Sequence, residues 1–555
     1  MRQQLKTQSL RYIYIFTTSL IFFLGSCRQP TTKVNEEIEN IAIENGYLAH
    51  EGYRRSMLFV NAWLPYADKE SGLIPRNLRE SIDIWNAKDA AADNYPFMVL
   101  TSAILEPALY KGKMAQILQT EIALTSRLDR LPDTYSFTKK DFAREKIDKD
   151  EIIFGASEYI KDGLLPLTEY IGHTPWSERM IALIDDIWKN ASYETPFGNI
   201  PSLNVEVNGE LLQALSRVYW MTGDKKYLNW AKRLGDYYLL GDQHPTDDVE
   251  VLRLRDHGCE IVSGLCELYV AVGNSDPEAA AAYKPHIYRM LDRILEVGIN
   301  EDGLFYNQIN PQTGEVLDER IADTWGYTYN AYYSIYLQDQ YEPYQEAVMR
   351  AMKNLHNYTH YDWEDGSADG YADAIESALN LYNREALPET KDWIDSEIQH
   401  MWSLQDSSYR KDTEAFRNTG IIEGWHGDGN FARTSIMYSL WKSQGVTASP
   451  WKNELYLGAS PLENGILISM VSDEEWEGKI KFDHSRHQSI FKLPLDYPRI
   501  NQLPEWFTVD KDQKYRVTFS KGESSQTYKG KELMAGIEIK LEKGHQVSFV
   551  VSPIK

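Results

Sequence analysis

The clearest pattern in the chain is a polar opening followed by a long apolar stretch with helical spacing. In residues 251–273, Arg255, Asp256 and His257 come first, and apolar side chains then recur every three or four positions through Val272. This periodicity predicts a buried helix whose first turn carries the polar groups. Because the same design recurs along the chain, we expect several helices to point polar N-terminal ends at one shared cleft.

Residues from about 36 to 443 show helical periodicity almost throughout. Long amphipathic segments alternate with segments that open on polar or acidic residues. The candidate helical pairs are 177–192 with 205–222, 225–240 with 248–272, 278–297 with 322–338, 341–358 with 371–382, and 389–404 with 428–443. Glu210 and Glu260 occupy equivalent openings, which indicates one helical hairpin roughly every 50 residues. Closed repetition of such hairpins predicts a mainly α fold, an (α/α) toroid of six or seven hairpins.

The pattern changes near Pro450. Short alternating runs at residues 465–469, 513–519 and 547–551 are separated by turn residues and predict strands. We therefore expect a toroid domain over residues 36–445, followed by a small β-sandwich-like module over residues 446–555. The module shows no cluster of catalytic residue types, so we assign it a structural role.

The first 26 residues predict a targeting segment. Three cationic residues precede an apolar stretch at 12–24 that is too short to span a bilayer comfortably. The sequence Leu24-Gly25-Ser26-Cys27 fits a bacterial lipobox, with an ordinary cleaved signal peptide as the alternative. We expect a signal peptide over 1–26, a lipidated Cys27 with a tether over 27–35, and an exported lipoprotein held at the outer membrane through its lipid alone.

Composition and charge narrow the choice of partner. The formal net charge of −24 would repel a polyphosphate backbone, so nucleic acid is not an expected partner. The 36 Tyr and 15 Trp residues fit either core packing or a cleft whose rings stack on sugars. Cys259 and Cys266 lie about 10.5 Å apart on one predicted helix, too far for a disulfide. Since no Cys-rich or His-rich spacing predicts a metal site, we expect no metal and no cofactor.

The catalytic candidates are His257, Tyr327, Tyr329 and His426. His257 is the strongest, because a neutral imidazole beside Asp256 and Arg255 can accept a weakly acidic proton near pH 7. Tyr327 and Tyr329 follow on the next inner helix, where a phenol can donate to a leaving oxygen. His426 lies in a glycine-rich loop, where the backbone can approach a ligand closely.

The substrate-binding candidates occupy the same openings. Asn208 can hydrogen-bond a substrate carboxylate, and Arg433 can pair with one through two hydrogen bonds. The remaining candidates are Arg255, Trp325, Glu376 and Trp425.

Acidic residues at these openings support a different chemistry. A pair of carboxyl groups is what glycoside hydrolysis requires. The residues that could supply the pair are Asp323, Asp373, Glu376 and Asp428.

The lipobox, the predicted toroid and the β module resemble the architecture of toroid polysaccharide lyases. Asn208, His257 and Tyr327 occur in the order in which those families use an Asn to neutralise a uronate carboxylate and a His and a Tyr to transfer protons. The chain also resembles lipoproteins of marine polysaccharide-utilisation systems, including an oligosaccharide dehydratase associated with ulvan breakdown. The architectural resemblance covers about 36–555. Tyr327 departs from the family pattern, since it lies well downstream of His257 on another predicted helix.

This resemblance implies β-elimination on an anionic, uronate-containing oligosaccharide of the sulfated, ulvan type. A base removes the proton at C5, and an acid assists departure of the group at C4. If that group is a sugar the enzyme is a lyase, and if it is a hydroxyl the enzyme is a dehydratase; both leave a 4,5-unsaturated uronate. Two alternatives stay open, a glycoside hydrolase acting on unsaturated uronyl ends and a non-catalytic glycan-binding surface lipoprotein. Convergence of His and acidic groups favours an enzyme over a binder.

Overall fold

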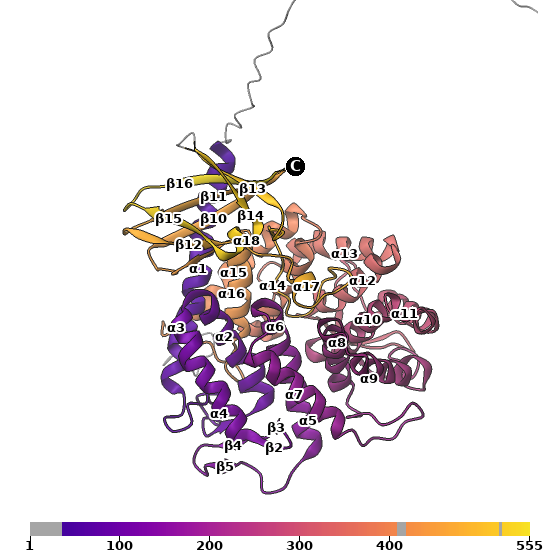
Figure 1. Ribbon diagram of the computed structural model, residues 1–555. Coiled ribbons are helices and arrows are strands. Elements are labelled where there is room, and N and C mark those ends of the chain that lie inside the picture. Colours follow the sequence, from indigo (N-terminus) through magenta and orange to yellow (C-terminus); the bar gives the residue numbers. More distant parts are fainter. Residues whose placement is uncertain (1–35, 408–417, 521–523, 555) are drawn as a thin grey trace, which may run out of the picture.

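The computed structural model describes residues 36–407, 418–520 and 524–554 of the 555-residue chain. The predicted signal peptide, Cys27 and tether therefore lie outside the described residues. Helices dominate up to Lys442, and most of the strand residues follow it (Figure 1). Among the described helices, none combines the length and the apolar character needed to cross a bilayer.

Seven inner helical segments form a closed ring in the described part of the chain. Each packs against the next in chain order, and the last returns to the first. They are buried on nearly all sides: every residue of α10 from Glu260 to Val272 is buried. The inner segments are η2 (Ala87–Asn94) with α2 (Tyr95–Leu105), α5 (Lys149–Glu158) with η4 (Tyr159–Leu164) and α6 (Leu165–Ile171), α8 (Val205–Thr222), α10 (Glu260–Gly273), α12 (Trp325–Asp339), α14 (Ala368–Tyr382) and α16 (Asn430–Lys442).

Amphipathic outer helices alternate with the inner ones along the chain and bury one face against them. These are α1 (Glu36–Trp63), α3 (Pro107–Leu109) with η3 (Tyr110–Met114) and α4 (Ala115–Thr125), α7 (Pro175–Lys189), α9 (Lys225–Gly235) with η5 (Asp236–Leu240), α11 (Pro277–Val297), α13 (Glu342–Asn354) and α15 (Pro388–Asp406). The fold is thus a mainly α toroid of seven hairpins, the larger of the two numbers expected.

The C-terminal strands form two packed antiparallel sheets. One has the order β10-β11-β16-β13-β14 and the other β15-β12-β9, and they enclose a separate apolar core. Helix α1 lies along β10 and β11, which joins the sandwich to the ring (Figure 1). The bounds are β9 (Thr447–Ser449), β10 (Leu455–Leu462), β11 (Gly465–Ser472), β12 (Trp476–Lys481), β13 (Lys514–Phe519), β14 (Ser525–Lys529), β15 (Ile537–Leu541) and β16 (Val547–Pro553), with the short helices α17 (Arg486–Ser489) and α18 (Gly530–Ala535).

Part of the segment between β12 and β13 leaves the sandwich and enters the ring. The Arg499 guanidinium pairs with Glu169 of α6 at 2.6 Å, and the Tyr497 hydroxyl donates to Glu267 of α10 at 3.0 Å. The backbone N–H of Asn501 donates to Glu376 of α14 at 2.7 Å. The C-terminal part of the chain therefore reaches the middle of the ring, which its alternating pattern did not predict.

Short strands and turns precede several inner helices, where the sequence pattern predicted continuous helix. The predicted helix 248–272 begins in the structure only at Glu260, because Asp256 has a left-handed φ of 51° and breaks the helical path. The turn η6 (Asp256–Cys259) and strand β6 (Leu252–Arg253) come before it. The other small strands are β1 (Ile84–Trp85), β2 (Ser126–Leu128), β3 (Leu131–Pro132), β4 (Tyr135–Ser136), β5 (Asp141–Phe142), β7 (Tyr306–Asn310) and β8 (Glu315–Ile321), and the other 3-10 turns are η1 (Leu64–Tyr66), η7 (Leu355–Tyr358) and η8 (Trp363–Gly366).

Helices α8 and α10 touch backbone to backbone through two glycines. A Cβ at Gly209 would lie 2.5 Å from the backbone N of Ile261, and one at Gly264 would lie 2.5 Å from the carbonyl O of Gly209. We expect Gly209→Ala to push the helices apart and lower the free energy of unfolding by about 1–3 kcal/mol, measured by urea denaturation. Gly112→Ala is the control, because no atom lies within 4 Å of the place that a Cβ would take there. Alanine is also more favourable than glycine in a helix, by up to about 1 kcal/mol. Equal stability of the two variants would contradict the close packing.

Candidate active site

One cavity opens in the middle of the ring, with a volume of about 610 Å³. Side chains from all seven inner segments line it, and Asn501 of the inserted segment joins them. Two of the contributing segments, η2 and η4, are π-helical, a rare geometry that is frequent at functional sites. The shared cleft expected from the polar openings is present in the structure.

The cleft is strongly acidic. Its twelve carboxyl side chains face five Lys or Arg side chains and two His. A cavity of this sign attracts cations and repels densely sulfated chains. The acidic residues are Asp89, Asp93, Glu158, Asp162, Glu206, Asp256, Glu260, Glu364, Asp365, Asp369, Asp373 and Asp428, and the basic ones are Lys88, Lys161, Arg253, Arg255 and Arg433.

Six of the candidate residues line this cleft, although they lie far apart in the sequence. Arg255 and His257 come from the turn before α10, and Tyr327 comes from the first turn of α12. The others are Trp425, His426 and Arg433, from the loop before α16 and from α16 itself.

Four candidates do not line the cleft. Trp325 and Tyr329 are fully buried, because they lie four residues apart on the face of α12 that is turned away from Tyr327. Asn208 is also fully buried, and its amide donates to the Ser202 carbonyl and the Tyr238 hydroxyl instead of facing the cleft where it was predicted to hold a substrate carboxylate. Glu376 is buried behind Tyr327 and supports the cleft from outside it.

Two aspartates on the π-helical turn η2 face the cleft beside His426. Nε2 of His426 lies 3.7 Å from Asp93 Oδ2 and 3.9 Å from Asp89 Oδ1. Burial raises the pKa of Asp93 to about 8, and the nearby Asp162 and Asp369 act in the same direction. Burial opposes ionisation of Asp89 too, but the His426 charge and the Asn86 and Arg76 donors outweigh it and lower that pKa. Near pH 7, therefore, one carboxyl holds a proton while its neighbour is ionised.

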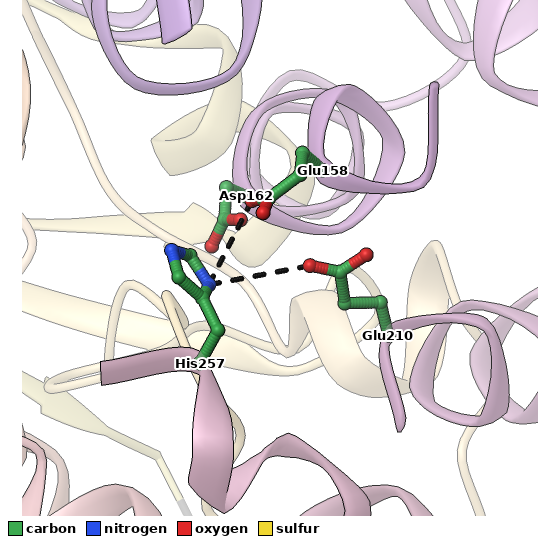
Figure 2. A group of neighbouring side chains, drawn as sticks. All are labelled: Glu158, Asp162, Glu210 and His257. Carbon is green, nitrogen blue, oxygen red and sulfur yellow. Dashed lines mark ion pairs between the residues drawn. The ribbon is translucent and has the colours of Figure 1, made fainter. Parts of the chain in front are cut away.

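His257 belongs to a second group, with Glu158, Asp162 and Glu210 (Figure 2). Its Nδ1 lies 3.7 Å from Glu158 Oε2 and 4.0 Å from Glu210 Oε1. Burial lowers the pKa of the imidazole, but neighbouring carboxylates, Asp256 foremost, outweigh it and hold that pKa well above its usual range. These carboxylates favour the protonated imidazole over the neutral form that the sequence analysis predicted.

Arg433 holds one wall of the cleft together. Its guanidinium lies 2.8 Å from Asp373 and 2.9 Å from Glu376, and it donates to the amide oxygen of Asn501 at 2.6 Å. The Tyr327 hydroxyl donates to Glu376 at 2.6 Å. Arg433 is only 1 % exposed and its guanidinium pairs with Asp373, Glu376 and Asn501, so these contacts assign it a role in positioning the inserted segment and, through Glu376, Tyr327.

The mouth of the cleft offers one cation and one ring to a ligand. Arg255 is partly exposed and lines the cavity, and no hydrogen bond or ion pair of its guanidinium occurs among the described residues. Trp425 is 70 % exposed, unusual for a residue of this size. An indole face can stack on a sugar ring, and a guanidinium can pair with a carboxylate.

Four of the cleft residues gave no separate signal in the sequence. Asp89 precedes Asp93 by four residues in a segment that is otherwise mostly Ala, and this spacing of two acids on one helix face was the available clue. Glu158 and Asp162 have the same spacing, but they lie in the middle of the inner segment formed by α5, η4 and α6 and not at a polar helix N-terminal end. Asn501 lies in an irregular segment without periodicity.

Comparison with known proteins finds solved structures that are similar to part of this chain. No family model matches the chain, and neither does any curated protein. The chain is similar to the GH76A alpha-1,6-mannanase from Salegentibacter sp. HEL1_6, at 12 % identity and a TM-score of 0.38 over 54 % of this chain and 90 % of that one. It is also similar to the unsaturated glucuronyl hydrolase from Bacillus sp. GL1, at 14 % identity and a TM-score of 0.35 over 53 % and 86 % of the two chains. At such values the likenesses carry no chemistry, which must come from the side chains of the cleft.

Proposed function

We propose that the protein is an enzyme that hydrolyses a glycosidic bond of uronyl-containing oligosaccharides in the ring cleft. The observation that carries this proposal is the pair Asp89 and Asp93, which face one cavity from one π-helical turn and have opposite pKa shifts. Glycoside hydrolysis needs one carboxyl group that gives a proton and one carboxylate that attacks or activates water. This supports hydrolysis over the β-elimination that the sequence resemblance implies.

Asp93 takes the role of acid and Asp89 the role of partner. Asp93 passes its proton to the glycosidic oxygen, so that the leaving sugar departs as a neutral hydroxyl. One Asp89 oxygen is held by Arg76 at 2.6 Å, while the other faces His426 and the cavity. Oxygens of the two carboxyl groups approach within 4.8 Å, less than the about 6.5–9.5 Å that leaves room for a water between them. The spacing therefore favours attack by Asp89 on the sugar, followed by hydrolysis of the covalent intermediate.

The substrate class follows from the mouth of the cleft. Arg255 supplies a guanidinium for a uronate carboxylate, and Trp425 supplies a stacking face for a sugar ring. The twelve carboxyl groups further in disfavour a heavily sulfated chain. We therefore place a uronyl residue at the mouth and neutral sugars deeper in the cleft.

β-Elimination is the second candidate, and the meeting of Arg255, His257 and Tyr327 in one cleft favours it. Burial and the neighbouring carboxylates keep the pKa of the Tyr327 hydroxyl well above its usual range, so it stays protonated. The charged state of His257 opposes this candidate, because elimination needs a base at C5.

Incubation with a panel of uronyl oligosaccharides separates the candidates, when ultraviolet absorbance and product masses are recorded together. Hydrolysis predicts two shorter products whose summed mass exceeds the substrate by one water, with no new conjugated uronate. New absorbance with chain cleavage would indicate a lyase, and new absorbance with loss of one water from an intact chain would indicate a dehydratase. A panel that binds but never turns over would leave a glycan-binding protein and refute both candidates.

Arg255→Gln tests the substrate class. We expect this variant to raise KM for uronyl substrates by about 10- to 100-fold, because a charged hydrogen bond contributes roughly 1.5–3 kcal/mol. KM for the corresponding neutral oligosaccharides should be unchanged. Arg253→Gln is the matched control, since that side chain already pairs with Asp256. An equal rise in KM for uronyl and neutral substrates would contradict a role in carboxylate recognition.

A further inference from the structure

Glu158, Asp162, Glu210 and His257 form a compact group on one wall of the cleft, called the four-residue cluster below (Figure 2). Glu158 and Asp162 come from the adjoining segments α5 and η4, Glu210 comes from α8 and His257 from η6. Each offers one oxygen or ring nitrogen, and these four atoms all lie within 4.8 Å of one another. We propose that the four-residue cluster binds one divalent cation of the Mn²⁺ or Ca²⁺ type.

Several carboxylate oxygens of the four-residue cluster are buried without hydrogen bonds. Glu210 is fully buried, and neither of its carboxylate oxygens accepts a hydrogen bond from the described residues. Glu158 Oε2 and Asp162 Oδ2 share this condition, with the two residues 3 % and 5 % exposed. Buried polar atoms are almost always paired, so oxygens that face one point without donors indicate a ligand that satisfies them. Figure 2 shows the Glu210 carboxylate directed toward His257.

The protein's own positively charged side chains do not occupy the point that the oxygens of the four-residue cluster face. Lys161 is the nearest ammonium group, and its Nζ contacts Asp162 Oδ1 at 2.5 Å and Glu260 Oε1. Among the described residues, the Glu210 carboxylate makes one ion pair, with the His257 ring at 4.0 Å. A cation bound between Glu158 and Glu210 would replace the proton of the His257 ring nitrogen that faces them.

The class of ion follows from the donor atoms and their spacing. Three carboxylates are hard oxygen ligands that suit Mn²⁺ and Ca²⁺, the imidazole favours Mn²⁺ over Ca²⁺, and soft-metal sites use thiolates. Ca²⁺ holds its ligands at about 2.3–2.6 Å, so atoms on opposite sides of it lie up to roughly 5 Å apart. The limit of 4.8 Å and the distances of 3.7 and 4.0 Å from His257 Nδ1 fall in that range. Tetrahedral Zn²⁺, with bonds near 2.0–2.1 Å, would need a tighter group.

The position of the cluster suggests what the cation does. Glu158, Asp162 and His257 line the cavity, and Glu210 lies behind them, so a bound ion would keep a face open to the cleft. This step rests on the proposed function: the open face of the ion would bind a uronate carboxylate or a sugar hydroxyl in an otherwise acidic cavity. Binding of the cation to the cluster does not itself depend on turnover of a substrate.

Mn²⁺ titration of the metal-stripped full chain, followed by the paramagnetic resonance signal of free Mn²⁺, tests the proposal. We expect one bound Mn²⁺ per chain. Glu210→Gln should weaken binding by more than about 10-fold, since even the loss of an outer-sphere partner costs 10- to 100-fold. This substitution nearly preserves volume and removes a buried charge, and circular dichroism and thermal denaturation confirm that the variant folds.

Two matched variants fix the location. Glu364→Gln removes a carboxyl of the same cleft outside the cluster and should leave Mn²⁺ affinity unchanged. Asp89→Asn removes a member of the second of three groups that could hold a metal, Asp89, Asp93 and His426, and should also leave the affinity unchanged. Absence of stoichiometric binding would overturn the inference, as would binding lost in Asp89→Asn and kept in Glu210→Gln. A protein that binds Mn²⁺ but turns over no oligosaccharide would refute the proposed function alone.

Discussion

Asp93→Asn is expected to lower kcat on uronyl oligosaccharides by about 100- to 10,000-fold, the range that a general acid contributes. Burial raises the Asp93 pKa to about 8, so the carboxyl holds its proton at neutral pH and loses it as the pH rises through 8. The wild-type rate should therefore be high below pH 8 and fall above it. The variant should lack this alkaline decline, because an amide does not titrate in that range. Steady-state kinetics across pH measures both effects.

A substrate with an activated leaving group isolates the role of the Asp93 proton. An aryl uronide whose phenol departs without protonation should be turned over by Asp93→Asn nearly as fast as by the wild type. Asp365→Asn is the control for loss of an aspartate, since Asp365 is an exposed rim residue paired with Arg320 at 3.4 Å. If Asp93→Asn keeps wild-type kcat on the natural substrate, Asp93 is not the acid.

Arg433→Met is expected to lower the free energy of unfolding by about 3–5 kcal/mol, the cost of removing one partner from a buried ion pair. The Arg433 side chain is fully enclosed and pairs with Asp373 and Glu376, so its loss leaves two buried carboxyl groups without a cation. It also frees Asn501, which ties the inserted segment to the ring. Urea denaturation monitored by tryptophan fluorescence measures the loss.

Two comparisons identify the cause of that loss. Arg320→Met removes an exposed ion pair with Asp318 and should cost no more than about 1 kcal/mol. Adding Glu376→Gln to Arg433→Met should restore part of the stability, because it removes one of the unpaired charges. Equal stability of Arg433→Met and Arg320→Met would contradict the structural role assigned to Arg433.

Much of the helical framework could be predicted from local sequence, because burial of the inner helices imposes a strong pattern. The segment 205–222 coincides with α8, and 225–240 coincides with α9 and η5. The pattern gave a wrong prediction before α10, where the polar residues were expected to belong to the helix. Polar residues with few apolar neighbours carry no periodicity, and the left-handed φ of Asp256 has no sequence signal in a non-glycine residue.

The sequence could predict a site residue only where the position along a helix decides which way the side chain faces. The polar openings correctly indicated a shared cleft, and Tyr327 faces it. Trp325 and Tyr329, two residues to either side, face the core instead, and one sequence does not say which face of an all-apolar helix meets the cavity. The four-residue cluster depends on contacts between segments that are distant in sequence, and local patterns hold no information about them.

The central claim is that the cleft hydrolyses a glycosidic bond, and turnover in water labelled with a heavy oxygen isotope tests it most directly. The purified protein would be incubated with uronyl oligosaccharides, and the first products would be analysed by mass spectrometry. We expect one heavy oxygen in the newly formed reducing end and none in the other product. Products without the isotope that carry a 4,5-unsaturated uronate would contradict it and assign the cleft to β-elimination.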